Sequence, residues 1–432
     1  MSNRSDVIDP RAVEVPPLPP GPRLGDLRNL ARNAVTLFRG TPQVMAHRLA
    51  ETPTTGTTVQ LNGDATLANF GLYRTAEDGL VFDFTEFDET HPGPWEWDVR
   101  RLAADLAVAG RSHGFTAAQR RRAVARSARR YREAMQRFSE ASSGEVARLR
   151  ADPDEARRQY DFGRAARRVT ARAGRTGGTT PAAGVGADSV VTGRPGPAAT
   201  SARTPTPRDR TGTARDRVEA MRAFVEGYAA SLLPEGRSVL AGHELTDVAR
   251  TLGRGADPTR RGWLLQLTSR SGGDTLLLEA TRARRCGLEG IEGLPPALGG
   301  PAERVARGRR LTQERDDPFV GWHRLDDDVA GRGDYQVHRA SHPVVSDGAV
   351  RVGSFSMSEY AELCAWTLAH AHARSGDRHA IAAHLVADHA FDQDLADFAE
   401  AYADLNDRDH RRLVTTEDQR SRPRRTTPVS RG

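Results

Sequence analysis

A segment near the middle of the chain limits what the whole sequence can fold into. Residues near 168–215 consist mainly of Gly, Thr, Pro, Ala and Arg, with hardly an aromatic or a large aliphatic side chain. Such a composition cannot bury enough apolar surface to offset the loss of chain entropy on folding. We therefore predict a disordered linker over residues 166–215, so that a compact fold must combine the segments before and after it.

The two ends of the chain share this character. Residues 1–22 include the run Pro16-Pro17-Leu18-Pro19-Pro20, which is typical of an unstructured arm with polyproline character. An Arg-rich, Pro-containing segment over residues 416–432 predicts a disordered tail. The mean hydropathy of −0.59 agrees with a chain that is only partly folded. We expect order in residues 23–165, 216–345 and 346–415.

Other sequence features bear on the compartment. No N-terminal signal is present, and no apolar run approaches the roughly 18 residues that span a bilayer. Cys286 and Cys364 provide neither a disulfide framework nor a metal-binding spacing. We expect a cytoplasmic protein that does not contact membranes.

The basic charge of the chain comes from arginine alone. All 63 Lys+Arg residues are Arg, and the formal net charge is +6. Much of the excess lies in runs such as Arg120–Arg122 and in the tail, which favours a solvated basic face over a nucleic-acid site. No aromatic-interleaved recognition motif accompanies these runs, so nucleic acid is an improbable partner that remains open.

Hydrophobic periodicity predicts an α+β protein. Helical patterns cover residues 24–46, 97–108, a long segment capped by Thr116, 216–233, a segment opened by the Ser356–Glu359 capping box, and a last helix with Leu395, Phe398, Tyr402 and Leu405 inward. Strands are predicted at Val59–Leu61, Leu80–Phe84, Trp263–Leu267, Thr275–Leu278, Gly308–Leu311, Phe319–Trp322 and Tyr335–Val337.

Three polar residues lie around the first two predicted strands. Asp64 and Asn69 are five residues apart in a turn-like segment, and Asp83 lies within the apolar run that follows. Phosphoryl transfer to a hydroxyl needs a carboxylate that orients the nucleophile, together with an amide oxygen and a second carboxylate that hold Mg²⁺. Spacing alone favours the interpretation of Asp64 and Asn69 as turn residues that bond to their own backbone, and only the surrounding family pattern described below reverses that preference.

Four segments of this chain carry a detailed family resemblance. They are Phe38-Arg39-Gly40, Gly63-Asp64-Ala65-Thr66-Leu67-Ala68-Asn69-Phe70-Gly71, Phe82-Asp83-Phe84-Thr85-Glu86-Phe87-Asp88-Glu89-Thr90 and Gly93-Pro94-Trp95-Glu96-Trp97-Asp98-Val99-Arg100-Arg101-Leu102. Together they resemble a bacterial family known as domain of unknown function 2252. The chain departs from it at Thr66, where the family has His, and at Thr85-Glu86, where it has Asn-Asp.

The order Asp64, Asn69 and Asp83 also resembles the catalytic segment of aminoglycoside-phosphotransferase-like kinases. This resemblance implies that Asp64 orients an acceptor hydroxyl while Asn69 and Asp83 hold Mg²⁺. It also gives Asp98 two possible roles, bracing the catalytic segment from behind or capping a helix. Arg39 and Arg101 could contact an anion or pair with the acidic residues Glu86, Asp88 and Glu89, which themselves could bind a cation or form a solvated turn. His372 is expected to be a core or supporting histidine.

The nucleotide-binding elements expected of a kinase lie downstream of this segment. Gly253 and Gly255 resemble the remains of a glycine-rich loop, although a lone Gly-x-Gly is more often a plain turn. Alignment through Leu276–Leu278 puts Thr281 where the family has lysine and Arg282 where it has glutamate. We therefore expect a protein-kinase-like two-lobe fold with circularly permuted order, in which residues 216–345 supply the small β-rich lobe.

The absence of lysine decides between the functional hypotheses at this level. Kinase-like sites place a lysine ammonium on the nucleotide phosphates, and arginine is a poor geometric substitute. We therefore expect a degenerate phosphotransferase with weakened or lost ATP use. The alternatives are an active enzyme using Mg²⁺ and ATP on a small-molecule hydroxyl, and a basic binding protein for nucleic acid or another polyanion.

Overall fold

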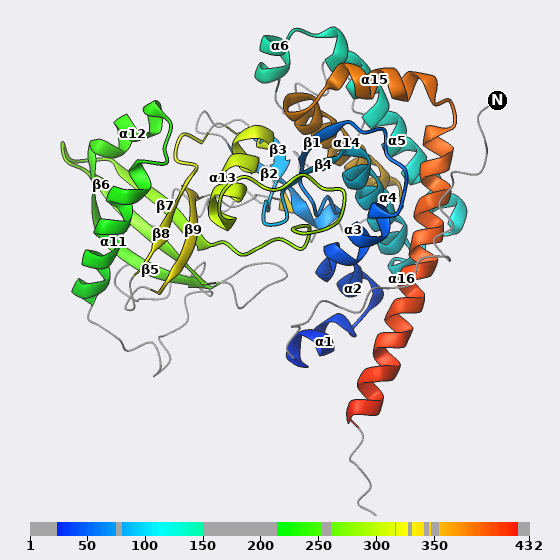
Figure 1. Cartoon of the computed structure of the whole chain (residues 1–432), viewed down its shortest axis with the longest axis horizontal. Helices are drawn as coiled ribbons and strands as arrows, with labels where there is room; N and C mark the ends of the chain where they lie inside the picture. The colour runs from blue at the N-terminus through cyan, green and yellow to red at the C-terminus, as the bar shows by residue number, and fades with distance from the viewer. Residues whose placement is uncertain are drawn as a thin grey trace, which may run out of the picture.

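The computed structural model describes two parts of the chain that meet along one junction (Figure 1). It covers residues 24–74, 80–149, 214–252, 261–315, 317–326, 331–340, 345–346 and 354–421. A helical body forms one part, and a five-stranded sheet with two helices forms the other. The mixed α+β class predicted from periodicity is confirmed. The predicted arm and almost all of the predicted linker lie outside the described residues.

The helical body is built around α14, which is apolar on most of its surface and therefore lies at the centre. Thr116 and Gln119 form the capping box that starts α5, as the sequence predicts. The helices of this body are α1 (Leu24–Leu30), α2 (Ala34–Gly40), α3 (Pro42–Ala50), α4 (Trp95–Ser112), α5 (Ala117–Glu140), α6 (Ser143–Arg148), α14 (Ser354–Ser375), α15 (Arg378–Ala387) and α16 (Phe391–Ser421).

Two small antiparallel sheets lie against these helices. β1 (Thr58–Leu61) pairs with β4 (His91–Pro94), and β2 (Phe70–Arg74) pairs with both β3 (Leu80–Phe84) and β10 (Val345–Ser346). The 3-10 turn η1 (Leu67–Asn69) leads into β2.

The β2–β3 hairpin has two chemically different faces. Phe70 stacks against Phe82 and Phe84, and Phe82 meets the ring of Tyr360 in α14. Since side chains alternate along a strand, this buried aromatic face turns Asp83 to the opposite side.

The other part of the chain is a sheet lobe. Helices α11 (Ala214–Ala229) and α12 (Pro234–Ala241) join a core on one face of the sheet that includes Phe224, Trp263 and Leu278. A turn containing Gly272 and Gly273, both with positive φ, joins the two predicted strands β6 and β7 into a hairpin. The strand order is β5-β6-β7-β9-β8, with all pairs antiparallel, in β5 (His243–Leu252), β6 (Arg261–Ser269), β7 (Thr275–Arg282), β8 (Gly321–Leu325) and β9 (Gly333–Arg339).

Helix α13 (Pro301–Thr312) lies at the junction and corrects one prediction. Gly308–Leu311 is helical and not a strand. A proline begins the helix, and its buried residues Ala302, Val305, Ala306, Arg309 and Thr312 recur at spacings of three and four, which is a helical period. Val305 joins the core of the helical body, so α13 belongs to both parts.

Other boundaries also differ from the expectations: α14 begins at Ser354, so the Ser356–Glu359 pattern lies inside the helix and does not open it. α16 continues to Ser421, so residues 416–421 extend the last helix and are not part of a tail. The strand predicted at Phe319–Trp322 begins at Gly321 in β8, whereas Phe319 and Val320 precede it. No helix among the described residues is long and apolar enough to cross a membrane.

Candidate functional site

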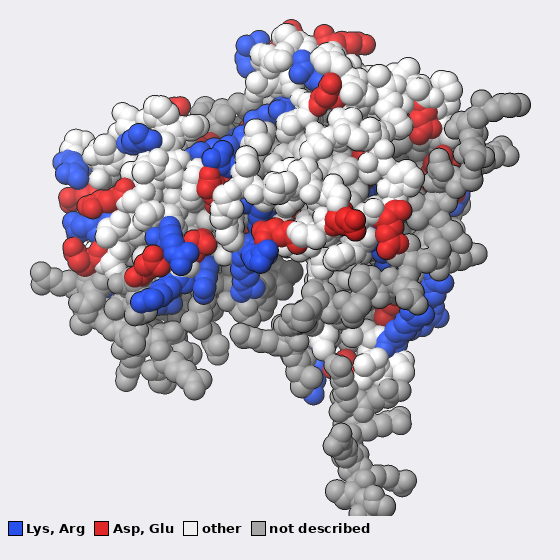
Figure 2. All heavy atoms as spheres, in the orientation of Figure 1, with Lys and Arg blue, Asp and Glu red and all other residues white. Residues whose placement is uncertain are grey.

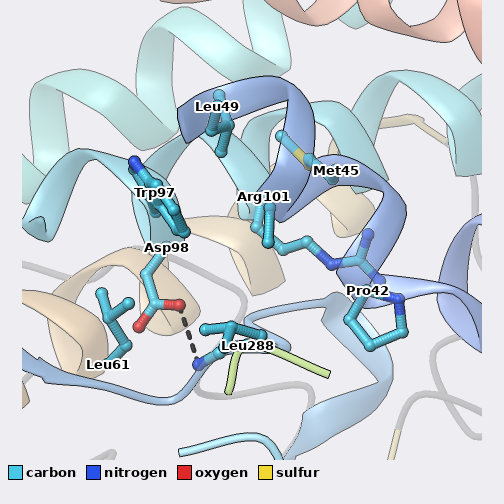
Figure 3. A pocket seen from close by; sticks show the side chains of 10 residues that line it. Pro42, Met45, Leu49, Leu61, Trp97, Asp98, Arg101 and Leu288 are labelled. Atoms are coloured by element: carbon cyan, nitrogen blue, oxygen red, sulfur yellow. Dashed lines mark hydrogen bonds between the residues drawn. The ribbon is translucent and has the colours of Figure 1, made fainter. Parts of the chain in front are cut away.

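Asp98 holds the loop that precedes Asp64 from behind. It lies in the first turn of α4, whose N-cap is Pro94 without any side-chain capping bond. The Oδ2 of Asp98 accepts from the backbone N of Asn62 at 2.7 Å, and its Oδ1 accepts from the backbone N of Gly63 at 3.0 Å (Figure 3). Of its two possible roles, the bracing one is therefore confirmed.

A buried histidine continues this support into the core. His372 lies with Nε2 3.4 Å from the Oδ2 of Asp98 and with Nδ1 2.8 Å from the hydroxyl of Tyr131. His370 contacts Glu314 and the carbonyl of Val146 instead. Both histidines are fully buried, and they share no partner. The expectation that His372 is a core or supporting residue is confirmed.

Asp64 forms an ion pair with Arg101. Its Oδ1 accepts from Arg101 Nη2 at 2.7 Å and from Nε at 3.0 Å. Arg101 lies 4.0 Å from the ring centroid of Phe38 and also donates to its carbonyl. Burial raises the pKa of Asp64, and the guanidinium opposes that shift. The side chain of Asp64 is 19 % exposed, so its carboxylate keeps contact with solvent although it is paired with Arg101.

Asn69 lies beside Asp64, as the predicted pairing requires. Its Nδ2 donates to the carbonyl oxygen of Asp64 at 2.7 Å and to its Oδ2 at 2.8 Å. No described residue donates to the Oδ1 of Asn69, which is therefore the oxygen that a cation could use.

Asp83 is saturated by protein donors. Its Oδ1 accepts from the backbone N of Phe84 and of Glu314, and its Oδ2 accepts from the backbone N and the Nε of Arg315, all at 2.8 to 3.3 Å. The side chain is 0 % exposed. Arg315 lies flat on Tyr73, 3.7 Å from the ring centroid. A magnesium ion therefore does not fit at Asp83 in this arrangement, because it would have to displace Arg315.

Arg39 supports the same loop through α4. Its Nε and Nη2 donate to the two oxygens of Asp105 at 2.9 and 3.0 Å, and Asp105 also accepts from the backbone N of Leu67. Arg39 and Arg101 are thus partners of carboxylates in α4 and in the loop.

The acidic segment after β3 meets the sheet lobe. Glu89 accepts from the backbone N of Gly287 at 2.6 Å, and Asp88 accepts from Gln336 in β9 at 3.5 Å. Gln336 is paired in register with Thr281 in β7, and directly opposed residues project from the same face of a sheet. Thr281 therefore lies on the sheet face that turns toward the acidic segment.

The other expected nucleotide-binding residues differ in placement. Thr281 is buried, while its neighbour Arg282 is exposed at the end of β7, so the two residues point to opposite faces. Gly253 and Gly255 lie outside the described residues.

A small cavity lies beside the loop that carries Asp64. Gly63, Asp98 and Arg101 line it together with apolar residues of α3 and with Leu288 (Figure 3). Its volume is about 10 Å³, which is the size that holds a single water molecule. This cavity therefore cannot hold a nucleotide.

Comparison with known proteins identifies the family of the chain. Residues 25–416 match the model of a family described as an uncharacterized protein conserved in bacteria, DUF2252. The chain belongs to the DUF2252 family. Neither curated proteins nor solved structures gave a match. Thr66, a point of departure from the family pattern, is 1 % exposed, and its Oγ1 has no hydrogen-bond partner.

The contact made by Glu89 could not be predicted from the sequence of this DUF2252 chain. The sequence shows an acidic cluster that contains Glu89, but no local pattern identifies Gly287 as its partner. Burial raises the pKa of Glu89 to about 7, and the nearby charges of Asp64 and Asp88 add to the shift. A carboxyl group with this pKa can exchange a proton at neutral pH beside Asp64.

Replacement of Glu89 by glutamine should change the pH dependence of stability. Because the folded pKa lies above the ordinary value of 4.5, the folded protein binds more protons than the unfolded chain between about pH 4.5 and 7. The wild type should therefore lose stability as pH rises through that window. Glu89→Gln should match the wild type near pH 5 and exceed it by about 1–3 kcal/mol at pH 8.

Denaturant unfolding at several pH values measures this difference. Glu133→Gln, which changes a 47 % exposed carboxylate in α5, serves as the matched control and should leave the pH slope unchanged. Parallel curves for the wild type and Glu89→Gln would contradict the assignment.

Proposed function

We propose that this chain is a degenerate phosphotransferase-like protein, in which Arg315 occupies the place beside Asp83 that a metal ion takes in an active enzyme. The contact between Arg315 and Asp83 carries the proposal. The guanidinium of Arg315 supplies, beside this fully buried carboxylate, the positive charge that Mg²⁺ would otherwise supply. Unlike Mg²⁺, it cannot coordinate the carboxylate and the phosphate oxygens of a nucleotide at the same time.

The sheet lobe supports the same interpretation. Thr281 is neutral and lies where the family has lysine, and the chain contains no lysine at any position. Electrostatic stabilisation by positioned cations provides most of the catalysis of phosphoryl transfer, and losing one costs on the order of 10²–10³ in rate. Nucleotide use should therefore be weak or lost.

A permuted kinase-like arrangement agrees with the contacts between the two parts. The segment with Asp64, Asn69 and Asp83 comes first in the chain, and the strand with Thr281 comes later. Even so, the contacts from Glu89 to Gly287 and from Asp88 to Gln336 join the two segments. These contacts put the sheet face with Thr281 next to the carboxylate segment, as a cleft between two lobes requires.

Calorimetry and thermal unfolding with nucleotide test the proposal. Addition of Mg·ATP to the purified chain should produce no measurable heat of binding and a shift in the unfolding temperature below about 1 °C. A shift of several degrees that disappears in Asp83→Asn would overturn the proposal, because it would show that Mg²⁺ can displace Arg315.

An active phosphotransferase is the second candidate, and the pair Asp64 and Asn69 favours it. Asp64 keeps 19 % exposure and is held at a fixed orientation by Arg101 and Asn69, as a residue that orients a hydroxyl must be. ATP turnover by the wild type that is lost in Asp64→Asn and retained in Asp404→Asn, a 68 % exposed control, would establish this function.

A further inference from the structure

Helix α13 carries four arginines, and three of them have matched partners. Arg304 donates to the carbonyls of Thr90 and Arg284, Arg307 pairs with Glu303 at 2.6 Å, and Arg310 donates to the carbonyls of Ser231 and Val320. The fourth, Arg309, forms no hydrogen bond or ion pair with any residue that the structure describes. Among the described residues, the ring of Phe87 lies against it, with its centroid 4.6 Å from the guanidinium.

Arg309 is nevertheless one of the more enclosed residues of the helix. It is 5 % exposed, and its Nε is fully buried without an acceptor. Burial and the nearby charge of Arg315 lower the pKa of Arg309 to about 10, so the group still carries its charge at neutral pH. A buried charge without a counter-ion costs several kcal/mol of stability.

The carboxylates near Arg309 are already engaged. Asp83 accepts from Arg315 and from three backbone N–H groups. Asp317 accepts from the backbone N of Phe319 and of Arg339. Neither carboxylate bonds to Arg309, so its guanidinium has no bonded anion among the described residues.

We propose that Arg309 binds the phosphate group of a small anion, either inorganic phosphate or a simple phosphate monoester. The guanidinium presents planar N–H groups that match the spacing of phosphate oxygens, and the ring of Phe87 lies against it. Arg315 also lies nearby, but its charge is paired with that of Asp83. The residual exposure of 5 % admits a small anion more readily than a nucleotide.

The location agrees with an anion site. Arg309 lies where α13 meets the segment after β3, at the junction of the two parts of the chain, and basic side chains gather along that junction in the view of Figure 2. The proposal is independent of phosphotransferase activity, because it requires neither Mg²⁺ nor ATP.

Thermal unfolding of the full chain in phosphate tests this site. In about 20 mM phosphate, compared with chloride at equal ionic strength and without Mg²⁺, the unfolding temperature of the wild type should rise by about 3 °C or more. Arg309→Gln should lose this rise. Arg307→Gln, which removes a half-exposed arginine of the same helix, should keep it. Any general salting-out effect of phosphate acts on all three proteins equally and cancels in the comparison.

Two further measurements make the outcome decisive. Without phosphate, Arg309→Gln and Arg309→Met should be at least as stable as the wild type, since both remove an uncompensated buried charge. Titration of glycerol 3-phosphate beside inorganic phosphate, followed by calorimetry, identifies the source of the phosphate group by the tighter binder.

An equal phosphate-induced rise in the Arg309 variants, or no rise in the wild type, would overturn the proposal. Lower stability of both variants in chloride would also overturn it.

Discussion

Replacement of Asp83 by alanine should lower the free energy of unfolding by about 3–5 kcal/mol. The substitution removes the carboxylate that pairs with the partly buried guanidinium of Arg315, and it removes the acceptor of the backbone N–H groups of Glu314 and Arg315. Denaturant unfolding at pH 7 without divalent ions measures the loss.

The direction of this change in stability distinguishes a structural clamp, in which Asp83 holds Arg315 by an ion pair, from a carboxylate that binds a metal ion. A carboxylate reserved for Mg²⁺ would be unpaired in metal-free protein, so its removal would be neutral or stabilising. In the double variant Asp83→Leu with Arg315→Met, much of the lost stability should return, because both charges leave the core together. Asp326→Ala, whose 64 % exposed carboxylate pairs with Arg324, is the matched control and should change stability by less than about 1 kcal/mol. Unchanged stability in Asp83→Ala would contradict the clamp.

Replacement of Asp98 by alanine should lower the free energy of unfolding by about 3–4 kcal/mol. One buried carboxylate accepts from the backbone N of Asn62 and of Gly63 and lies next to His372. Without it, two buried N–H groups and one ring nitrogen lose their acceptor. The loop that positions Asp64 should also loosen, which faster hydrogen exchange at Gly63 and Asp64 would report.

A matched pair of variants isolates this bracing role. Asp404→Ala removes a 68 % exposed carboxylate that pairs with Arg111 and should cost less than about 1 kcal/mol. Asp98→Asn should fall between wild type and Asp98→Ala, because an amide oxygen can accept from only part of the same donor set. If Asp98→Ala unfolds at the same denaturant concentration as the wild type, the loop is held by other contacts.

Elements with strong local signals could be predicted from the sequence. The cap at Thr116 placed the start of α5, and the strands predicted at Trp263–Leu267 and Thr275–Leu278 correspond to β6 and β7. The strand predicted at Gly308–Leu311 was wrong because four residues are too few to distinguish the period of a strand from that of a helix. The decisive signal lay upstream, in Pro301 and the spacing that follows it.

The candidate site, too, could be predicted from the sequence only in part. Family resemblance and spacing pointed to Asp64 and Asn69, and the structure brings their side chains into contact within a single loop. The role of Asp98 stayed open between two alternatives because the backbone N–H groups that donate to it lie 35 and 36 residues away. No sequence pattern identified Arg315, which meets Asp83 across 232 positions.

By itself, the sequence determined the family, the α+β class and the chemical character of the carboxylate segment, because each depends on residue identity and local spacing. Only the tertiary structure decided which charges pair and which do not. Asp83 is paired with Arg315, whereas Arg309 is enclosed without a counter-ion. The physical reason is that pairing and desolvation depend on groups that are distant in the chain and a few ångströms apart in the fold.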